Sequence, residues 1–403
     1  MTVMDYDILI SGAGPAGLCL ARALSGSGLS IALIEPQPEP ALQDPAFDGR
    51  EIALTQHSAQ LLRRLGVWER FDPADLSPLR DARVLNGASP FAMVIGHQLS
   101  RHAELGWLVS NHLIRRAAYA AVAEARSTHG DITLITGDSV NGVHTDRDLA
   151  QVRLASGREL RARLLVAADS RFSATRRAMG IAADLHDFGR SMLVCVMTHD
   201  APHDHAAWEW FDHGQTLALL PMNPDPASGQ HRSSVVLTLP SQEIDPMLTQ
   251  PAADFNRAMA ERFHQRLGAM QLLSTRHVYP LVAVYPRQLV ATRFACVGDA
   301  AVGMHPVTAH GFNFGLLSLD NLAGLVRAAH ASGRDIANPA DLARYEQTHR
   351  RATRPLYLAT QFITRLYTDE TPPARLLRSA ALRLGERFTP FKRAVAASLT
   401  GAH

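Results

Sequence analysis

Three glycines and one acidic residue near the start of the chain have a spacing that suits a dinucleotide. Gly12-Ala13-Gly14-Pro15-Ala16-Gly17 follows a short apolar run at Tyr6–Ile10. Gly12 allows a tight turn, Gly14 lets a pyrophosphate approach the backbone, and Gly17 lets the following helix pack on the strand. Glu35 comes 18 residues after Gly17, where its carboxylate can accept hydrogen bonds from both hydroxyls of an adenosine ribose and disfavours a 2′-phosphate. The pattern predicts bound FAD or NAD rather than NADP; the alternative is a glycine-rich turn that binds nothing.

A second group of chemically capable residues lies nearly three hundred positions later, between Arg293 and Asn321. Asp299 ends a predicted buried strand, and ligands of doubly wound sheets bind beyond the carboxyl ends of such strands. Its carboxylate can accept a hydrogen bond from the ribityl chain of a flavin. The helix that begins near Gly311 can stabilise negative charge on a reduced isoalloxazine ring. This group favours a bound flavin over a nicotinamide substrate.

The intervening sequence predicts elements that hold these residues. Apolar runs and amphipathic stretches predict strands at Ser30–Ile34, Ile132–Ile135 and Arg161–Ala168, with helices at Leu18–Leu24, Ser58–Leu65, Leu113–Ala125 and Phe312–Ala329. From about Arg190 the pattern changes to strands separated by turns, which predicts a mostly antiparallel sheet. The last seventy residues read as helices at Leu342–Tyr367, Ala374–Phe388 and Phe391–Leu399, the first kinked at Pro355.

Composition limits the other functions. The chain has 403 residues and a net charge of +2, so there is no general case for nucleic-acid binding. Cys19, Cys195 and Cys296 lie far apart in apolar runs, which is typical of core residues in a reducing compartment. No run reaches the roughly 18–20 apolar residues that span a bilayer, and the first strand leaves no room for a signal peptide. We expect a cytoplasmic protein, with peripheral contact at the inner face of the membrane as an option.

Three motifs carry a family resemblance. GAGPAG (12–17), AADSRFSATR (167–176) and GDAAVGMHP (298–306) resemble those of group A FAD-dependent aromatic monooxygenases. Within that group the chain is most similar to the ubiquinone-biosynthesis hydroxylases of the UbiH/UbiF/UbiM type, above all the UbiM-like branch. DGREIALTQHSAQLLRRLGVWER (48–70) and LARYEQTHRR (342–351) extend the resemblance over essentially the whole chain.

The resemblance implies an α/β fold (α+β overall) like that of para-hydroxybenzoate hydroxylase. A Rossmann-like FAD-binding domain would comprise 1–78, 100–185 and 286–335. An inserted, mostly antiparallel β-sheet domain for substrate would comprise 79–99 and 186–285, and 336–403 would form a helical C-terminal region.

The resemblance also implies roles for individual residues. The FAD pyrophosphate would lie in the loop formed by Gly12, Ala13, Gly14, Pro15, Ala16 and Gly17. The Glu35 carboxylate would bind the adenosine ribose. Further FAD contacts would come from Arg50, Asn111, Arg115, Asp169, Asp299, Pro306, Gly311, Phe312 and Asn313. NAD(P)H would reduce the flavin transiently, O2 would form a C4a-hydroperoxide, and an aromatic carbon would receive the oxygen.

Two positions depart from the family pattern. Ser170 follows Asp169 where the family usually has glycine, which leaves open how closely NAD(P)H approaches. His310 stands where the family usually has glutamine. A histidine beside the flavin can donate a hydrogen bond or shuttle a phenol proton, so His310, with the flavin-adjacent Pro306, is a candidate catalytic residue. The alternative for His310 is a capping or packing role.

Other motifs predict less. The histidines of HDAPHDH (199–205) have metal-like spacing, but we expect a solvated turn and no metal site. Trp208-Glu209-Trp210 is similar to an element of flavin-dependent halogenases, yet the only lysine, Lys392, lies in the tail and does not suit a halogenase. From Leu342 onward there are eleven Lys/Arg and four Asp/Glu. These arginine-rich helices either contact anionic lipid or partner proteins of ubiquinone biosynthesis, or pack on the protein body.

The sequence therefore predicts an FAD- and NAD(P)H-dependent monooxygenase that hydroxylates a hydrophobic polyprenylated phenol in ubiquinone biosynthesis. Two alternatives stay open: a hydroxylase of a small aromatic compound, and a non-catalytic subunit of a quinone-biosynthesis assembly.

Overall fold

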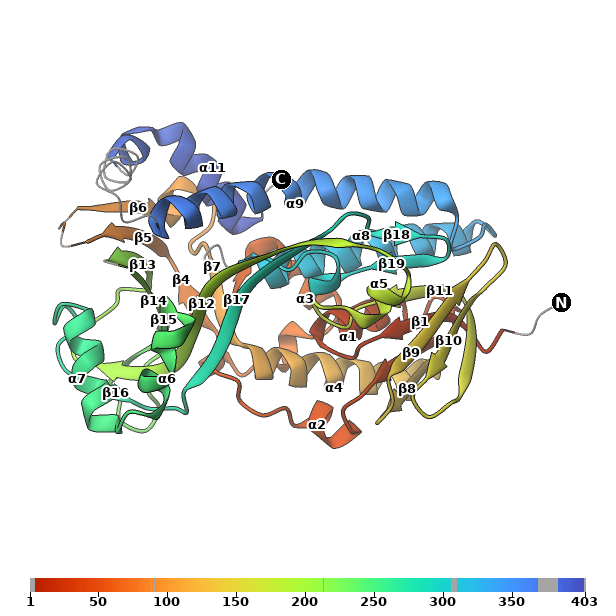
Figure 1. Ribbon diagram of the computed structural model, residues 1–403, viewed down its shortest axis with the longest axis horizontal. Helices are drawn as coiled ribbons and strands as arrows, with labels where there is room; N and C mark the ends of the chain where they lie inside the picture. Colours follow the sequence, from red (N-terminus) through yellow and green to blue (C-terminus); the bar gives the residue numbers. More distant parts are fainter. Residues whose placement is uncertain are drawn as a thin grey trace.

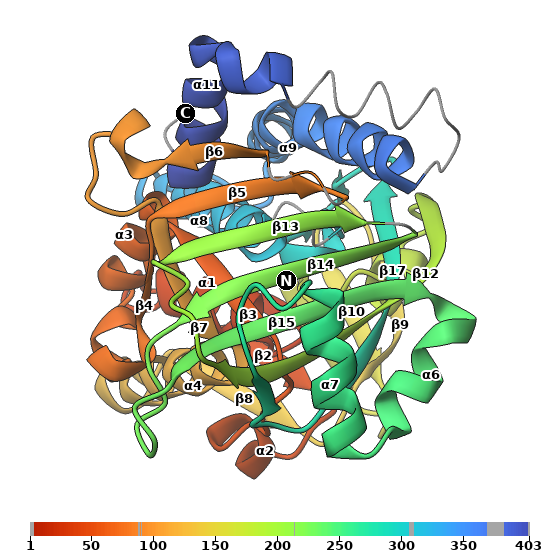
Figure 2. The ribbon, with the colours of Figure 1, turned by 90° about the vertical axis from the view of Figure 1, so that its left-hand side faces the viewer.

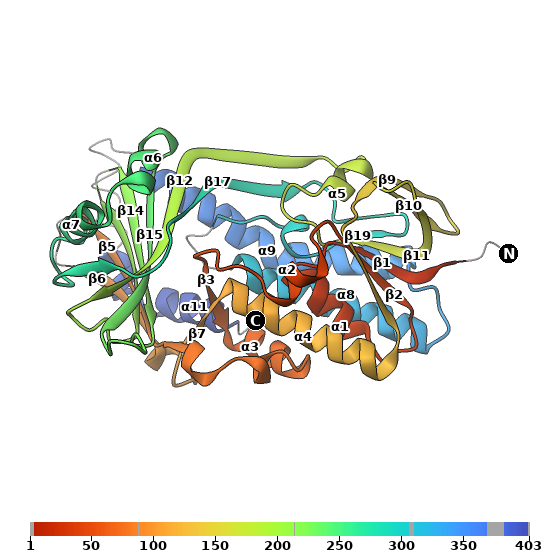
Figure 3. The same cartoon turned by 90° about the horizontal axis from the view of Figure 1, so that it is seen from below.

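Two large sheets lie at opposite ends of the molecule, and two long strands run between them (Figure 1). The computed structural model describes residues 4–87, 89, 91–212, 214–305, 310–368 and 383–401. The connecting strands are β12 (Ala183–His199) and β17 (His277–Pro286), which pair antiparallel along most of their length. Figure 3 shows both strands extending from the sheet that carries β14 toward the sheet that carries β1, with opposite chain directions.

The first sheet has the order β18-β19-β11-β1-β2-β8, in which β19, β11, β1, β2 and β8 are parallel and β18 pairs antiparallel with β19. Its residues are nearly all buried in β1 and β2, as expected where both faces of a parallel sheet are covered. The strands are β1 (Tyr6–Ser11), β2 (Ile31–Glu35), β8 (Ile132–Thr136), β9 (Val140–Thr145), β10 (Ala150–Leu154), β11 (Glu159–Ala167), β18 (Val290–Ala291) and β19 (Phe294–Cys296).

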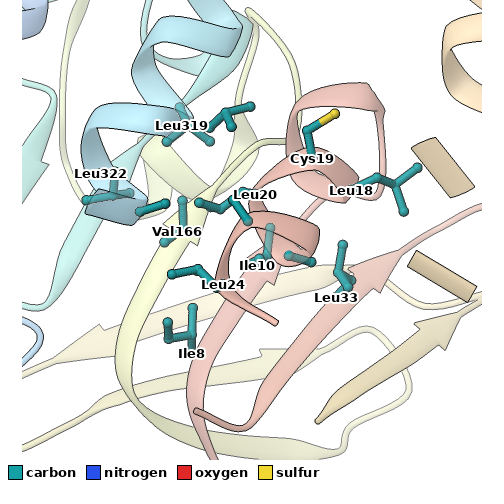
Figure 4. Packing of buried hydrophobic residues seen from close by; sticks show 14 of the residues in the cluster. Ile8, Ile10, Leu18, Cys19, Leu20, Leu24, Leu33, Val166, Leu319 and Leu322 are labelled. Carbon is teal, nitrogen blue, oxygen red and sulfur yellow. The ribbon is translucent and has the colours of Figure 1, made fainter. Parts of the chain in front are cut away.

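Three long helices belong to this half: α1 (Pro15–Leu24), α4 (Asn111–His129) and α8 (Gly311–Ala331). Leu20 and Leu24 of α1 pack with Leu319 and Leu322 of α8 over Ile10 of β1 (Figure 4). This core holds the amino ends of α1 and α8 close together, although nearly three hundred residues separate them.

The second sheet has the order β16-β12-β15-β14-β13-β5-β6, with β17 paired to β12. All its pairings are antiparallel except that of β13 with β5. Its remaining strands are β5 (Asp81–Asn86), β6 (Ala92–Gly96), β13 (Ala206–Asp212), β14 (Gln215–Met222), β15 (His231–Pro240) and β16 (Met270–Leu272). The helices α6 (Ser241–Thr249) and α7 (Ala252–Arg262) cover one face of this sheet, where Phe255 and Phe263 pack with Trp210 and Trp208.

Smaller elements complete the structure. The strands β3 (Glu51–Thr55), β4 (Ser77–Leu79) and β7 (Gly106–Ser110) form a small sheet. The short helices are α2 (Glu39–Gln43), α3 (Gln56–Arg64) and α5 (Ala174–Ala178), with 3-10 turns at Trp68–Arg70, Pro73–Asp75, His97–Leu99 and Gly298–Ala300.

The carboxyl-terminal helices α9 (Pro339–Thr368) and α11 (Thr389–Thr400) lie at the side of the molecule that carries β6 (Figure 2). Ala396 of α11 packs with Met93 and Ile95 of β6, so part of the tail is attached to the body. No helix in the described part of the chain is long and apolar enough to cross a membrane. The predicted helix at 374–388 falls largely outside the described residues.

The predicted α/β architecture is confirmed, and the differences concern single elements. The strands expected from about Arg190 begin with β12, which is long and already starts at Ala183. The predictions missed α6, which contains Pro246, and α2, which begins at Glu39 between two prolines. Proline at the start of a helix costs no internal hydrogen bond, because the first N–H groups have no partner in the helix. The helix α2 therefore tolerates Pro38 as its N-cap residue and Pro40 in its first turn.

Candidate active site

One cavity of about 950 Å³ extends from the glycine-rich loop after β1 to the open face of the second sheet. It is large for a single small-molecule site, and it touches both halves of the molecule. Of the predicted site residues, the lining includes Gly12, Ala13, Gly14, Pro15, Ala16, Glu35, Arg50, Asn111, Arg115, Asp169, Asp299, Gly311 and Phe312. Gly17, His310 and Asn313 are not in the lining, and Pro306 lies outside the described residues.

Each glycine of the loop after β1 is suited to its position for a different structural reason. Gly12 has φ +104, and a Cβ there would lie 2.6 Å from the carbonyl oxygen of Ala168. A Cβ on Gly17 would lie 2.0 Å from the carbonyl oxygen of Gly12, so Gly17 permits the helix to pack against the turn. A Cβ on Gly14 would meet no protein atom within 4 Å. Because Gly14 lines the cavity, its open side is room for a ligand.

The amino end of α1 suits an anionic group. Gly14 is its N-cap residue and makes no side-chain capping hydrogen bond, and Pro15 is the first helical residue. The unsatisfied N–H groups of such a helix end and its positive dipole attract phosphate. Gly298 lies so close that a Cβ there would be 2.8 Å from the Cβ of Ala16. The two motifs that the sequence separates are therefore in contact.

Glu35 is buried at the end of β2 and supports the loop. Its Oε2 accepts a hydrogen bond from the Ala13 N–H at 2.8 Å, and its Oε1 accepts one from the Gln37 N–H at 3.1 Å. Each carboxylate oxygen retains capacity for a further donor. The carboxylate can thus fix the loop and receive ribose hydroxyls at the same time; the sequence pattern indicated only the second role.

Asp48 organises the side of the cavity that carries Arg50 and Asn111, and the sequence reasoning missed it. Its carboxylate accepts hydrogen bonds from the Arg50 guanidinium at 2.6 Å and from Asn111 Nδ2 at 2.7 Å. Burial opposes its ionisation, but the Arg50 charge and these hydrogen bonds hold the pKa of Asp48 below its usual value. The Arg50 guanidinium also lies 5.3 Å from the ring centre of Tyr279. Arg115 is held separately, by Gln37 Oε1 at 3.1 Å.

Asp169 and Ser170 form the turn between β11 and α5. The Asp169 carboxylate accepts hydrogen bonds from Ser173 Oγ at 2.5 Å, from the Thr175 N–H at 3.1 Å and from Thr175 Oγ1 at 2.9 Å. It therefore holds the start of α5 as well as lining the cavity. Ser170 has φ +101, a region that residues with a Cβ rarely adopt. The backbone thus keeps a glycine-like conformation at the position where the family resemblance leads us to expect glycine.

Asp299 forms an ion pair across the cavity wall. Arg171 donates to its carboxylate at 3.2 Å and to the carbonyl oxygen of Val282 at 3.0 Å. The Asp299 side chain remains 37% exposed, which leaves it open toward the cavity. A ribityl hydroxyl can share this carboxylate with Arg171.

The start of α8 attaches to the small sheet. Asn313 Oδ1 accepts a hydrogen bond from the Thr55 N–H at 3.0 Å, and its Nδ2 donates to the carbonyl oxygen of Ala53 at 2.8 Å. A Cβ on Gly311 would meet no atom of the described residues within 4 Å, and Gly311 lines the cavity, so this helix end opens to it. His310 is buried, with Nε2 at 3.2 Å from Ser398 Oγ of α11. The structure gives His310 a packing position, and its catalytic role stays a prediction.

Three further titratable groups line the cavity, and no site role was predicted for them from the sequence. Glu51 accepts a hydrogen bond from Ser110 Oγ, and burial raises its pKa to about 7. Burial, with the positive charge of Arg171, lowers the pKa of His305 to about 4. Glu209, on β13, has its pKa raised to about 8 by burial. Each of the three lies within a motif quoted from the sequence, but only the fold shows that its side chain lines the cavity.

The histidine-rich segment is not the solvated turn we expected. His199 and His203 are 2% and 6% exposed. His199 Nε2 contacts Ser233 Oγ at 2.8 Å, and His203 Nε2 contacts the carbonyl oxygen of Met222 at 2.9 Å. Burial lowers the pKa of His199 to about 4. His199 thus connects β12 to β15, and His203 connects the loop after β12 to β14, so both rings pack inside the fold.

The cavity fits FAD. The open sides of Gly14 and Gly311 leave room where side chains would otherwise project, the α1 end lacks a side-chain cap, and Glu35 keeps lone pairs for a ribose. A glycine-rich loop after the first strand of a parallel sheet, joined by one cavity to an antiparallel sheet, is the arrangement of an enzyme that binds a dinucleotide cofactor next to a substrate.

Comparisons with known proteins agree. Residues 5–357 match the family described as FAD binding domain. The chain is 44% identical to the ubiquinone hydroxylase UbiM of Neisseria meningitidis, over 99% of this chain and 85% of that protein. It is 32% identical to the ubiquinone hydroxylase UbiL of Rhodospirillum rubrum, over 96% of this chain and 87% of that protein. The chain belongs to the ubiquinone hydroxylase family of FAD-dependent monooxygenases.

A solved structure supports the fold. The crystal structure of p-nitrophenol 4-monooxygenase from Pseudomonas putida superposes with a TM-score of 0.76, covering all of both chains at 17% sequence identity. At this identity the likeness concerns the fold alone.

Proposed function

We propose that this protein hydroxylates the aromatic ring of a polyprenylated phenol or quinol intermediate of ubiquinone biosynthesis, with FAD as cofactor, NAD(P)H as electron donor and O2 as co-substrate. The observation that carries the proposal is the single cavity that joins a dinucleotide loop to a mostly apolar sheet face. An enzyme that only binds NAD would not need its dinucleotide loop connected to an apolar sheet face. A flavin that acts on a hydrophobic ring needs this connection, because the ring must reach the cofactor.

The cofactor would lie along the lining residues described above. Gly12, Gly14 and the α1 end would hold the pyrophosphate and Glu35 the adenosine ribose. Asp299 would bind the ribityl chain, and the α8 end at Gly311 would face the isoalloxazine. These assignments rest on lining position, on open space at the glycines and on the charge of the helix ends.

The residues around the ring would orient and protect the reaction. When bound, FAD supplies the electron transfer and oxygen chemistry. The protein would hold the ring against the cofactor, and its apolar walls would exclude water and so limit side reactions that consume O2 without hydroxylating the ring. Arg50, fixed by Asp48, and Asn111 form the polar wall opposite Tyr279.

The apolar part of the cavity suits a prenyl-bearing ring. Met192, Val194, Phe211, Leu220 and Val236 line it from four strands of the second sheet. Burying apolar carbon contributes about 0.8 kcal/mol per CH2 group, so such a wall binds a prenylated ring better than a small polar one.

We propose further that the protein works at the cytoplasmic face of the membrane, by peripheral contact or through other proteins of ubiquinone biosynthesis. Large apolar side chains are exposed on the C-terminal helices: Leu358 (53%), Phe362 (65%), Leu384 (70%) and Phe388 (56%). Arginines dominate the charge of the same region. Apolar and cationic groups together favour an anionic lipid surface.

Two measurements test the proposed function. Purified protein is expected to carry FAD and to lose its flavin absorbance when NAD(P)H is added. A strain that lacks the protein is expected to accumulate a quinone precursor one ring oxygen short of the product, identified by mass. Normal quinones in that strain, with no accumulated precursor, would contradict the assigned substrate, and absence of FAD would contradict the class of enzyme.

A further inference from the structure

The strand β13 carries one carboxyl group into the cavity between two tryptophans that point away from it. Trp208 and Trp210 pack with Phe255 and Phe263 under the helices α6 and α7. Because successive side chains of a strand alternate between faces, Glu209 lies on the opposite face, and it lines the cavity. The Trp-Glu-Trp motif of the sequence therefore separates into a core pair and a cavity-facing acid.

The neighbours of Glu209 on this face are apolar. Across the sheet it pairs with Ala218 of β14, which pairs with Val236 of β15, which pairs with Val194 of β12. On the other side its partner is Val84 of β5. This row offers no hydrogen-bond donor.

Glu209 lacks a protein partner in the described part of the chain. No side chain or backbone group described there donates to its carboxyl group, and burial alone, without a neighbouring charge, accounts for the raised pKa. Ser234, which also lines this face, has a buried Oγ without a hydrogen-bond partner. Polar groups in an apolar wall are costly unless something pairs with them. Both groups lie where a ligand would sit.

We propose that Glu209 is a specificity-determining residue whose carboxyl group forms a hydrogen bond with a ring hydroxyl of the aromatic substrate. The inference rests on the proposed function and adds the group that selects a phenol within it. The apolar row of Ala218, Val236 and Val194 would contact the unsubstituted part of the ring and its chain. No other acid of the second sheet lines the cavity among the described residues.

The chemistry of the carboxyl group explains why a phenol is favoured. A neutral carboxylic acid both donates and accepts, so it can pair with a hydroxyl that is itself donor and acceptor. A ring without the hydroxyl would leave the buried carboxyl group unpaired. A site built to hydrogen-bond a hydroxyl rejects an analogue that lacks it more strongly than an apolar pocket rejects an added one.

The test compares two ligands and three variants of the full FAD-loaded protein. The ligands are a short-chain prenylated phenol and the same molecule without its hydroxyl, and binding is followed through the absorbance of the bound flavin. Glu209→Leu removes the hydrogen bond, and Glu209→Gln keeps a donor and an acceptor. The control is Glu261→Gln, which alters an exposed glutamate at the outer end of α7.

The wild-type protein and Glu261→Gln are expected to prefer the phenol. In Glu209→Leu the ratio of the two dissociation constants should fall about tenfold, which corresponds to the loss of one buried hydrogen bond. In Glu209→Gln this ratio should stay within about threefold of the wild-type ratio. Flavin content should be equal in all variants. An unchanged preference in Glu209→Leu would overturn the assignment of Glu209 while leaving the proposed function standing. Failure of the wild-type protein to bind either ligand would overturn both.

Discussion

The backbone at Ser170 allows a quantitative test of the turn that lines the candidate flavin site. A residue with a Cβ at φ +101 carries about 1–3 kcal/mol of strain. The Ser170 side chain is exposed and makes no hydrogen bond in the described structure, so glycine would lose no contact there. Greater freedom of glycine in the unfolded chain offsets about 0.5–1 kcal/mol of the gain. Ser170→Gly should therefore raise the free energy of unfolding by about 1 kcal/mol.

Urea unfolding at a fixed, saturating concentration of FAD measures this change. For a slope on the order of 3 kcal/mol/M, the midpoint should rise by about 0.3 M. Ser170→Ala keeps the Cβ and should give no such gain, which separates backbone strain from loss of the hydroxyl.

The matched control is Ser127→Gly, at an exposed position inside α4 where φ is helical. Glycine there should lower the free energy of unfolding by about 0.5 kcal/mol, because glycine disfavours helix. If Ser170→Gly destabilises the protein as Ser127→Gly does, then the backbone at Ser170 is not strained, and the reasoning from its φ angle is refuted.

Three further predictions concern the cavity. Gly14→Val should fold but be purified without FAD, whereas Gly17→Val should fail to fold. The reason is that a Cβ at Gly17 would lie 2.0 Å from a backbone oxygen, while a Cβ at Gly14 meets open space. Circular dichroism and flavin absorbance distinguish the two variants, and equal behaviour would contradict the assignment of Gly14 to the FAD site. Asp48→Ala should weaken FAD binding about tenfold, since Arg50 loses its charged partner; unchanged FAD affinity would show that Asp48 does not position the flavin wall. The contribution of Glu209 to the free energy of unfolding, measured as the difference between the wild-type protein and Glu209→Gln, should become less favourable as pH rises from about 4.5 to about 8, because folded Glu209 keeps a proton that the unfolded chain has released. The full shift corresponds to about 4–5 kcal/mol, which partial exposure to the cavity reduces to about 1–2 kcal/mol, and Glu209→Gln should flatten this part of the profile.

The sequence predicted the nucleotide half of the molecule well because its signals are local. The tight turn at Gly12, the close packing at Gly17 and the acid at Glu35 each depend on neighbours within one strand-helix-strand unit. The order of the motifs along the chain suggested that this strand-helix-strand unit and Gly298 belong to one site. The structure adds how they meet, with Gly298 close to Ala16.

The cavity wall formed by the second sheet could not be predicted in the same way. Nothing in the sequence around Glu209 distinguishes a cavity-facing acid from a solvent-facing one, since both fit the alternation of a strand. Its surroundings come from pairings with β14, β15 and β12, which are distant along the chain. Asp48 was overlooked for a similar reason, because its partner Asn111 is 63 residues away.

The histidine segment shows how burial changes an interpretation. A polar, turn-like stretch reads as solvated, yet His199 and His203 satisfy their ring nitrogens with groups on β14 and β15. Sequence spacing gives no information about such partners, because they belong to other strands.

The most direct test of the central claim follows one oxygen atom. Purified protein is incubated with FAD, NAD(P)H, a polyprenylated phenol and 18O2, and the lipid product is analysed by mass spectrometry. The account predicts a ring-hydroxylated phenol that carries one 18O atom, formed only while NAD(P)H is consumed. Consumption of NAD(P)H without a labelled phenol, or a product whose new oxygen comes from water, would contradict it.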